Sequence, residues 1–321
     1  MSNYEKRKNS VITENAPSVA ILLAHYNGEK YIREQLNSLQ KQTYQNINIY
    51  ISDDCSTGKS FEHLRWLVKK QNKFIRLKRN NQNRGHTKTF LSIPKTLGTV
   101  DFYAFCDQDD IWREDKIERS VLILKEIEKK TPSLYCSRTE ITDQNGKRVI
   151  ALSPLYKKPP SFKNALAQNI GGGNTMVFNS AASDLICQTA NNIDLVAHDW
   201  WAYIIVTGAG GSVYYDQIPT LKYRQHGANV IGFNGSWAAR FIRLKKLLTG
   251  EYKLWNDKNI EALKLNQHLL TPENRNTLRL FDEARKSKLW PRLILFKKSG
   301  VHRQTFISQV LLWLAIILGK I

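Results

Sequence analysis

The chain has 321 residues, enough for one sizeable core with an appendage or for two modest domains. Apolar residues make up 42% and charged residues 24%, proportions that exclude an intrinsically disordered chain. The net charge of +20 indicates an anionic partner, such as nucleic acid, anionic lipid or a phosphorylated substrate. Residues 233–321 contain 17 basic and 6 acidic residues and so carry +11 of this charge, whereas nearly all the clustered acids lie earlier.

Strands alternate with helices along the first part of the chain. Short apolar runs predict strands at 18–24, 47–52, 74–78 and 101–106. Helical spacing predicts helices at 29–40, 61–70, 86–97 and 111–125, the last capped by Asp110. This alternation predicts an α/β fold with a mostly parallel central sheet.

Beyond Pro132 the alternation weakens. Residues 171–173 are three glycines and predict a loop, and strands are expected at 212–215 and 221–223. From residue 237 the sequence turns basic and helical, as in the segment FIRLKKLL. We therefore expect a polar tail (1–17), an α/β domain (18–232) and a basic, helical C-terminal region (233–321).

Export and membrane-spanning signals are weak. Residues 1–17 are polar and lack the apolar stretch of a secretory leader. The longest apolar run, 310–318 preceded by Phe306 and Ile307, is shorter than the roughly 20 residues that span a bilayer. The four cysteines form no CxxC pair, which favours reduced thiols. A cytoplasmic location is expected.

Polar residues follow three of the predicted strands. Parallel sheets bind ligands beyond the carboxyl ends of their strands, where residues 24–27, 53–54 and 107–110 would meet. Asp107 and Asp109, two residues apart at a strand end, suit a hard divalent cation that also binds phosphate. The alternatives are ordinary: a solvated acidic turn at 107–110, a turn at 53–54, and a core position for Tyr26.

Taken together, these segments resemble family 2 glycosyltransferases. SVAILLAHYNGEKYIREQLNSLQKQTYQNINIYISDDCST is similar to the opening of that family, and FCDQDDIWREDKIE resembles its Asp-x-Asp segment; the similarity covers roughly residues 18–230. It implies a nucleotide-sugar-binding domain of the GT-A fold. The sequence departs from the family at Ala24, where Thr is common, and at Cys55, where Gly is common.

The resemblance also implies roles for individual residues. Ala24 and Tyr26 would flank the nucleotide base, Asp53 and Asp54 would belong to the nucleotide site, and Asp54 would hydrogen-bond the base. Asp107 would lie near the ribose.

Asp109 would hold the Mn²⁺ or Mg²⁺ ion bound to the diphosphate. Such a cation stabilises the leaving group, and Arg84 or Lys88 would add positive charge.

A carboxylate is needed to take the proton from the acceptor hydroxyl. In inverting members of the family this base lies in a downstream acidic segment followed by aromatic residues, and we expect Asp199 in the segment HDWW to be the base. The alternative is that Asp199 caps a helix whose tryptophans are core.

Further residues are expected around the acceptor and the sugar. His226 would complete the metal shell, although a core hydrogen bond is an equal alternative. The residues expected to contact the acceptor or the donor sugar are Gly172, Gly173, Asn174, His198, Trp200, Trp201 and Arg224.

A narrower resemblance concerns the substrates. The segments DQDDIW, HDWW and YRQHGAN are similar to those of bacterial rhamnosyltransferases that build cell-wall or capsular polysaccharides. This implies dTDP-L-rhamnose as donor and a lipid-linked glycan as acceptor. A UDP-hexose donor is the alternative.

The C-terminal region mixes cationic and apolar positions, which is typical of a helix lying on an anionic membrane surface. A peripheral location on the cytoplasmic face of the membrane follows. The alternative is a helical cap packed on the α/β domain. Nucleic acid is not expected as a partner, since no recognised RNA or DNA module is present.

Three competing functions share some of these features. A haloacid-dehalogenase-type phosphatase has a strand-end Asp-x-Asp but a different residue pattern after it. A sugar nucleotidyltransferase needs a glycine-rich basic loop after the first strand, which HYNGEKY is not. A non-catalytic basic adaptor would lack metal-dependent nucleotide binding.

Overall fold

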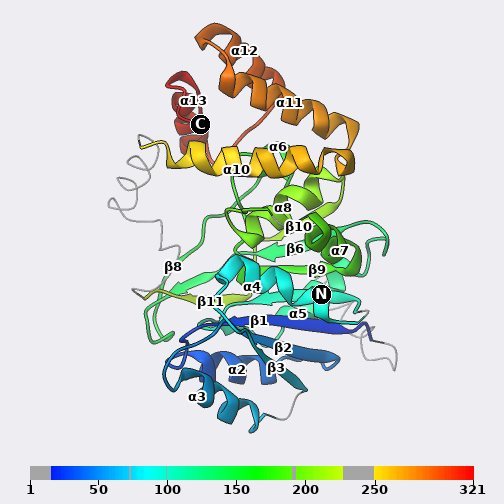
Figure 1. Ribbon diagram of the computed structural model, residues 1–321, viewed down its shortest axis with the longest axis vertical. Helices are drawn as coiled ribbons and strands as arrows, with labels where there is room; N and C mark the ends of the chain where they lie inside the picture. Colours follow the sequence, from blue (N-terminus) through cyan, green and yellow to red (C-terminus); the bar gives the residue numbers. More distant parts are fainter. Residues whose placement is uncertain (1–15, 72–73, 99, 190–192, 227–248) are drawn as a thin grey trace.

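The computed structural model describes residues 16–71, 74–98, 100–189, 193–226 and 249–321. Its centre is a seven-stranded sheet in the order β10-β6-β9-β4-β1-β2-β3 (Figure 1). The strands are β1 (Val19–His25), β2 (Ile47–Asp53), β3 (Ile75–Arg79), β4 (Phe102–Cys106), β6 (Ser133–Ser137), β9 (Val177–Asn179) and β10 (Ser212–Asp216).

Most of this sheet is parallel. β1 pairs in parallel with β2 and β4, β2 with β3, and β6 with β10, whereas β9 runs antiparallel to both of its neighbours. The α/β fold with a mostly parallel sheet is therefore confirmed, and the first four strands lie within a residue of their predicted bounds. The antiparallel strand β9 was not predicted.

Alternation along β1 explains how helices cover both faces of the sheet. Successive strand residues point to opposite faces, so the fully apolar β1 must be covered twice. Val19, Ile21 and Leu23 belong to one buried cluster, together with side chains of α2 (Ile32–Gln40), α3 (Ser60–Val68) and α5 (Lys116–Leu124). Ala20, Leu22 and Ala24 belong to the other.

The second cluster is built with helices of the opposite face. They are α4 (His86–Ser92), α6 (Phe162–Ala165), α7 (Ser180–Thr189) and α8 (His198–Gly208).

Two predicted helices were wrong in extent. The helix expected at 86–97 ends at Ser92 and is followed by a 3-10 turn (Pro94–Thr96), because proline lacks the N–H of a continuing helix. The segment expected as a helix from Ile111 begins instead as a short strand, β5 (Ile111–Trp112), and α5 starts at Lys116 after Asp115. Asp110 is therefore not a helix cap.

The strand β5 belongs to a small second sheet, in the order β5-β11-β7-β8, with β7 (Glu140–Thr142), β8 (Val149–Leu152) and β11 (Leu221–Arg224). Trp112 pairs with Leu221, and both side chains are buried. Pairing with a strand more than a hundred residues away is a tertiary effect that local helical spacing does not register.

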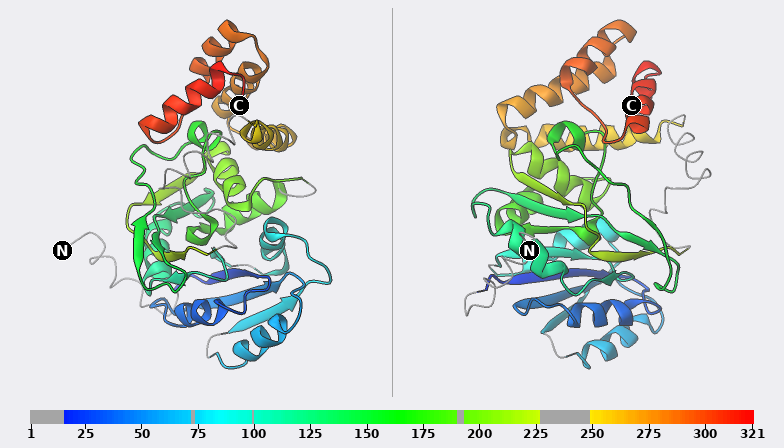
Figure 2. Two further views of the ribbon diagram at one scale, coloured as in Figure 1. Left: turned by 90° about the vertical axis from the view of Figure 1, so that its left-hand side faces the viewer. Right: turned by 180° about the vertical axis from the view of Figure 1, so that it is seen from behind.

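Within residues 249–321, the part of the C-terminal region that the structure describes, the α-helices are α10 (Glu251–Leu265), α11 (Pro272–Lys286), α12 (Leu289–Ser299) and α13 (Phe306–Ile317). They lie at one end of the molecule, at the far end from β3 (Figures 1 and 2). Leu263, Phe281 and Phe296 share one buried cluster with Phe162 and Ile205 of the α/β domain. The C-terminal region thus packs on α6 and α8 through a common core.

The described residues cover only part of the segment in which the basic C-terminal region is expected to begin. The boundary expected near residues 231–232 and the segment FIRLKKLL lie outside the described residues. Within the described ranges, no helix is both long enough and apolar enough to cross a membrane.

Candidate functional site

The carboxyl ends of β1, β2 and β4 meet at one edge of the sheet. Ala24 lies beside Ser52, His25 beside Asp53, and Leu23 beside Cys106, so the segments that follow these strands begin side by side. The expectation that residues 24–27, 53–54 and 107–110 line one edge is confirmed by this register.

Asp53 is buried and links the ends of β1 and β2 through hydrogen bonds. Its carboxylate accepts hydrogen bonds from Ser56 and lies 2.7 Å from Nδ1 of His25, and its side chain has no exposed surface. Burial alone would raise the pKa of Asp53, but the hydrogen bonds from His25 and Ser56 outweigh it and lower the pKa. The direct contact with nucleotide expected for Asp53 is not supported, because the carboxylate is enclosed.

Asp54 holds the loop after β3. Its carboxylate accepts hydrogen bonds from Asn80 Nδ2 at 2.9 Å and from the backbone N–H groups of Arg84 and Gly85 at 3.0 and 2.8 Å. A carboxylate has about four acceptor positions, so three donors leave room for one further bond. Asp54 therefore fixes the loop and has one acceptor position left, although only 3% of its surface is exposed.

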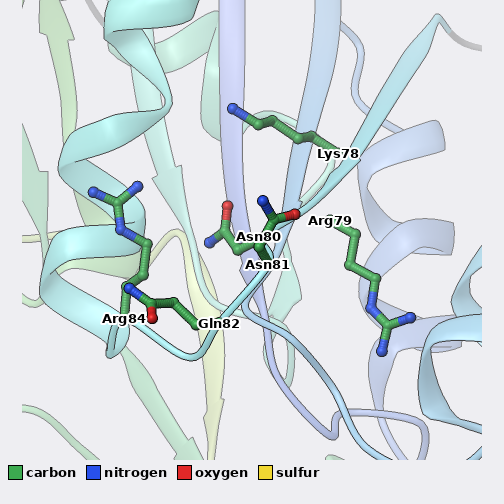
Figure 3. Close-up of a pocket in the computed structure, with 6 residues that line it drawn as sticks. All are labelled: Lys78, Arg79, Asn80, Asn81, Gln82 and Arg84. Atoms are coloured by element: carbon green, nitrogen blue, oxygen red, sulfur yellow. The ribbon is translucent and has the colours of Figure 1, made fainter.

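The same loop forms a cationic pocket, lined by Lys78, Arg79, Asn80, Asn81, Gln82 and Arg84 (Figure 3). Asn80 and Arg84 are also the residues that hold Asp54. Arg79 turns away from the others and donates to the backbone oxygen of Ser56 at 2.8 Å. The pocket places positive charge beside Asp54, as expected for Arg84. Lys88 is exposed in the first turn of α4.

The turn after β1 is tied to the Asp-x-Asp segment. The side chain of Gln108 accepts from the backbone N–H of Tyr26 at 2.9 Å and donates to its carbonyl oxygen at 3.0 Å. A Cβ on Gly28 would lie 2.2 Å from Oε1 of Gln108, so only glycine allows this approach. The ring of Tyr26 is exposed, which excludes a core position, whereas Ala24 is buried.

Cys55 adopts a backbone conformation that glycine prefers. Its φ is +64°, in the left-handed region that costs most side chains about 1–2 kcal/mol. This accounts for the glycine common at this position in the family, and Cys55 is a departure that the fold tolerates.

Asp109 and His226 form a possible metal-binding pair. Nε2 of His226 lies 2.9 Å from Oδ2 of Asp109, and the histidine ring stacks on Tyr31 with centroids 4.7 Å apart. Burial and the charge of Asp107 raise the pKa of Asp109. These are the two residues expected to hold the metal, and the fold brings them together across 117 positions of sequence.

The donor set fits a cation that shares its shell with substrate. Within the part of the chain that the structure describes, no three His, Cys, Asp or Glu residues gather to hold a metal ion. Mg²⁺ is usually bound by one or two carboxylates, with substrate phosphates and water completing the shell. Asp109 fits that pattern as a carboxylate ligand, whereas the imidazole of His226 is not one of its oxygen donors, and a metal bond from His226 stays a prediction.

Arg224 holds the backbone of Asp109 in place. Its guanidinium is buried, forms an ion pair with Glu34, and donates from Nε to the carbonyl oxygen of Asp109 at 2.8 Å. It also lies 5.2 Å from the ring centre of Tyr31. The sugar contact expected for Arg224 is not supported, because its guanidinium is enclosed among protein groups.

Asp110 connects two loops of the site. Its buried carboxylate accepts a hydrogen bond from Nδ2 of Asn174, and burial raises the pKa of Asp110 well above its ordinary range. Asn174 therefore fixes the glycine loop to the Asp-x-Asp segment. It is buried, so its side chain serves the loop rather than an acceptor.

Asp199 faces the glycine loop from the first turn of α8. Its Oδ2 accepts the backbone N–H of Gly173 at 3.0 Å, and its Oδ1 accepts the N–H of Trp200 at 2.7 Å. Burial raises its pKa, against the lowering effect of these two hydrogen bonds. Ala197, not Asp199, occupies the cap position, so the alternative role as helix cap is not supported.

The charges of this edge interact. Nε2 of His86, at the start of α4, lies 3.1 Å from Oδ1 of Asp107. Burial would lower the pKa of His86, but its hydrogen bond with Asp107 and the charges of Asp107, Asp199 and Asp109 raise it. His86 thus joins the expected nucleotide and base residues into one electrostatic cluster.

Sequence reasoning missed His86, and it placed His25 at this edge, within residues 24–27, without giving it a role. Neither matches a recognised motif position. The available signal was that His25 is the last residue of β1 and His86 the first residue of α4.

Three residues of the HDWW segment lie behind the site rather than in it. His198 is buried against Phe90, with ring centroids 4.3 Å apart, and burial lowers its pKa far below the ordinary range. Trp201 is fully buried and donates from Nε1 to Thr189. Trp200, half-buried, donates from Nε1 to the carbonyl oxygen of Ala165. The burial of His198 and Trp201 does not support the sugar contacts expected for them, and the contact expected for Trp200 stays a prediction.

Gly173 explains why His198 still matters for the loop. A Cβ at this position would lie 2.4 Å from Nε2 of His198 and 3.3 Å from Cβ of Asp199. A Cβ on Gly172 would meet only Oδ1 of Asn174, at 2.8 Å. Gly173 therefore allows the loop to approach α8 closely enough to hold Asp199.

Several known proteins resemble this chain in sequence or in fold. The profile of the family described as "Glycosyl transferase family 2" matches residues 20–185. The chain is 30% identical over 232 residues to "dTDP-rhamnosyl transferase RfbG" of Shigella flexneri, covering 69% of this chain and 78% of that protein. It is 29% identical over 224 residues to an uncharacterized glycosyltransferase of Haemophilus influenzae, covering 67% of each.

Solved structures share the fold. Staphylococcus aureus TarS in complex with UDP-GlcNAc has a TM-score of 0.52 at 13% identity, covering 88% of this chain and 90% of that one. The mannosyltransferase PcManGT of Pyrobaculum calidifontis, in complex with GDP-Man and Mn²⁺, has a TM-score of 0.53 at 13% identity, covering 99% and 92%. The GT-A fold is thereby confirmed, and the chain belongs to the family 2 glycosyltransferases.

Proposed function

We propose that this glycosyltransferase transfers L-rhamnose from dTDP-L-rhamnose to a hydroxyl group of a lipid-linked glycan. The observation that carries the reaction type is a group of acidic residues at one edge of the sheet. Asp107 pairs with His86, Asp109 pairs with His226, and Asp199 is held by the N–H of Gly173. The rhamnosyl donor is supported by the 30% identity with a protein named dTDP-rhamnosyl transferase.

The nucleotide would lie along the ends of β1 and β2. The exposed ring of Tyr26 offers a surface for the base, and Asp54 has one acceptor position left for a base N–H. The cationic pocket beside Asp54, with Lys78 and Arg84, lies at the same end of the sheet and favours an anionic ligand.

The diphosphate would be held at Asp109. A divalent cation, Mn²⁺ or Mg²⁺, supplies positive charge next to the departing diphosphate. Arg224 fixes the backbone of Asp109, and Tyr31 fixes the ring of His226. Asp109 and His226 are therefore already oriented before the substrate arrives.

Asp199 is the base of the proposed reaction. It accepts the proton of the acceptor hydroxyl while that oxygen bonds to the anomeric carbon, and the nucleotide diphosphate leaves with the electrons of the broken C–O bond. Attack from the side opposite the leaving group inverts the configuration. A raised pKa makes Asp199 a stronger base than an exposed carboxylate.

The acceptor and its location complete the proposal. A lipid-linked acceptor in cell-wall or capsular polysaccharide synthesis would place the enzyme at the cytoplasmic face of the membrane as a peripheral protein. The net charge of +20 supports an anionic surface as partner.

Calorimetric titration with dTDP, UDP and GDP, each with and without Mn²⁺, tests the donor. We expect Mn²⁺-dependent binding of dTDP, weakened in Asp109→Asn because the oxygen ligand loses its charge. Preference for UDP would replace rhamnose by a UDP-hexose as the donor. Lack of binding by every nucleotide would overturn the catalytic proposal in favour of a basic adaptor.

A further inference from the structure

We infer that the exposed face of α13 is a membrane-insertion surface that lies in the headgroup region of an anionic lipid bilayer. This deepens the proposed function, on which it rests only for its use, because a surface-bound enzyme reaches a lipid-linked acceptor. Binding to lipid itself requires neither nucleotide nor acceptor, so the two proposals can be tested separately.

The helix α13 has two opposite apolar faces. One face packs inward through Leu312, Ala315 and Ile316, all buried. The other face is also apolar but exposed, and its residues recur at the spacing of a single helical stripe. They are Phe306, Ile307, Val310, Leu311, Leu314, Ile317 and Leu318.

The fold does not need this outer stripe. α13 is anchored by its inner face, by an edge-to-face contact of Trp313 with Phe296 of α12, and by Arg292, which donates to the carbonyl oxygen of Ile316. Its start is fixed by a capping box between Thr305 and Ser308. Exposed apolar patches on soluble monomers are usually small, and a contiguous stripe this long marks a binding surface.

Charge identifies the partner. Residues 284–321 contain eight Lys and Arg and no Asp or Glu. Lys297 and Lys298 are exposed on α12, and Lys320 is exposed just after α13. Each cation near an anionic membrane surface contributes about 1 kcal/mol of attraction. The same cations would repel one another across a symmetric contact between two copies of this region, so anionic lipid fits the surface better than a second copy.

Dimensions fix how the helix lies. α13 has 12 residues and is therefore about 18 Å long, against about 30 Å for the apolar core of a bilayer. It cannot span the membrane, but its apolar stripe can enter the interface while the flanking lysines contact headgroups. Trp290 and Ile294, exposed on the neighbouring α12, add an aromatic and an aliphatic side chain to this end of the molecule.

Vesicle flotation of the full chain tests the inference. We expect wild-type protein to float with vesicles of phosphatidylcholine and phosphatidylglycerol and much less with phosphatidylcholine alone. The double variant Phe306→Ser/Ile307→Ser removes the two most exposed apolar side chains of the stripe, 83% and 67% exposed. It should lower the affinity for anionic vesicles by roughly tenfold or more, because two large side chains no longer enter the apolar layer.

A matched control separates this stripe from general surface hydrophobicity. Leu254→Ser/Leu265→Ser changes two leucines of α10 that are 62% and 65% exposed, and it should leave flotation unchanged. The charge-reversal variant Lys297→Glu/Lys298→Glu should reduce binding to anionic vesicles and remove most of its salt dependence. Nucleotide binding measured on each variant reports folding and tests the donor proposal independently.

Several results would overturn the inference. They are no flotation of wild-type protein with anionic vesicles, equal flotation with neutral vesicles, and equal losses in the α13 variant and the α10 control. A change of oligomeric state in the α13 variant, with unchanged vesicle binding, would assign the surface to a second copy instead.

Discussion

The edge of the central sheet and the C-terminal helices α12 and α13 differ in how they expose polar and apolar side chains. At the sheet edge, carboxylates are partly or fully buried, and nearly every one has a defined protein partner: Asp53 with His25, Asp54 with Asn80, Asp109 with His226. On α12 and α13, cations have no acidic residue on the same segment, and large apolar side chains face outward.

This difference indicates the kind of ligand that each region is suited to bind. A buried, hydrogen-bonded carboxylate keeps a fixed position and a shifted pKa, which suits chemistry on a small ligand. An exposed apolar stripe with flexible cations fixes no geometry but suits a large, deformable surface. Amino-acid substitutions in each region test whether the two regions differ in this way.

The largest effect should come from the proposed base. Asp199→Asn keeps the shape of the side chain but cannot accept a proton, so kcat should fall by about 10²–10⁴-fold while dTDP binding is retained. Asp194→Asn, an exposed carboxylate paired with Lys258, serves as the control and should leave kcat unchanged. A kcat in Asp199→Asn equal to wild type would exclude Asp199 as the base.

The pH dependence sharpens this test. Because the pKa of Asp199 is raised, its basic form is lost as pH falls through that raised pKa, and kcat of wild-type enzyme should decline on the acid side. Residual activity of Asp199→Asn should lack this limb. An unchanged acid limb in the variant would assign the titration to another group.

A large effect on stability should come from the core that joins the two regions. Phe281 is fully buried beside Phe296 in the cluster shared with α6 and α8. Phe281→Ala should lower the free energy of unfolding by about 3–5 kcal/mol through the cavity it leaves. If one core joins the regions, denaturant unfolding stays a single transition. A separate early transition would show that the C-terminal region unfolds alone.

A smaller effect is expected at the glycine loop. Gly173→Ala places a Cβ 2.4 Å from Nε2 of His198, so the loop must shift, at a cost of about 1–3 kcal/mol. kcat should fall as well, because this shift moves the backbone N–H at position 173 that holds Asp199. Gly98→Ala, where an added Cβ meets nothing within 4 Å, is the matched control. Equal midpoints of denaturation for the two variants would contradict this account.

The smallest effect on stability should come from α13. Phe306→Ser alters an exposed side chain with no packing role, so the free energy of unfolding should change by about 0.5 kcal/mol at most. The same substitution is expected to weaken vesicle binding. Substantial destabilisation measured by denaturant titration would mean that Phe306 serves the fold, and the contrast between the two regions would weaken.

Local sequence patterns were enough to predict the alternating strands and helices, the edge at which polar residues meet, and the family. These depend on local patterns: apolar runs of strand length, helical spacing, and aspartates placed directly after strands. The strand bounds at β1, β2 and β4 followed from such runs, and so did the nearness of Asp54, Asp107 and Asp109. The basic, apolar composition of the C-terminal residues was also a local property.

Which of these residues support others rather than face a ligand became clear only from the three-dimensional contacts. Asp53 and Arg224 are charged residue types that often bind ligands. Here Asp53 is enclosed by His25 and Ser56. Arg224 is enclosed by Glu34 and the backbone of Asp109. Ile111, expected to begin a helix, lies instead in a strand that pairs with β11. Burial and pairing of this kind depend on contacts between segments far apart in the chain, which no local periodicity records.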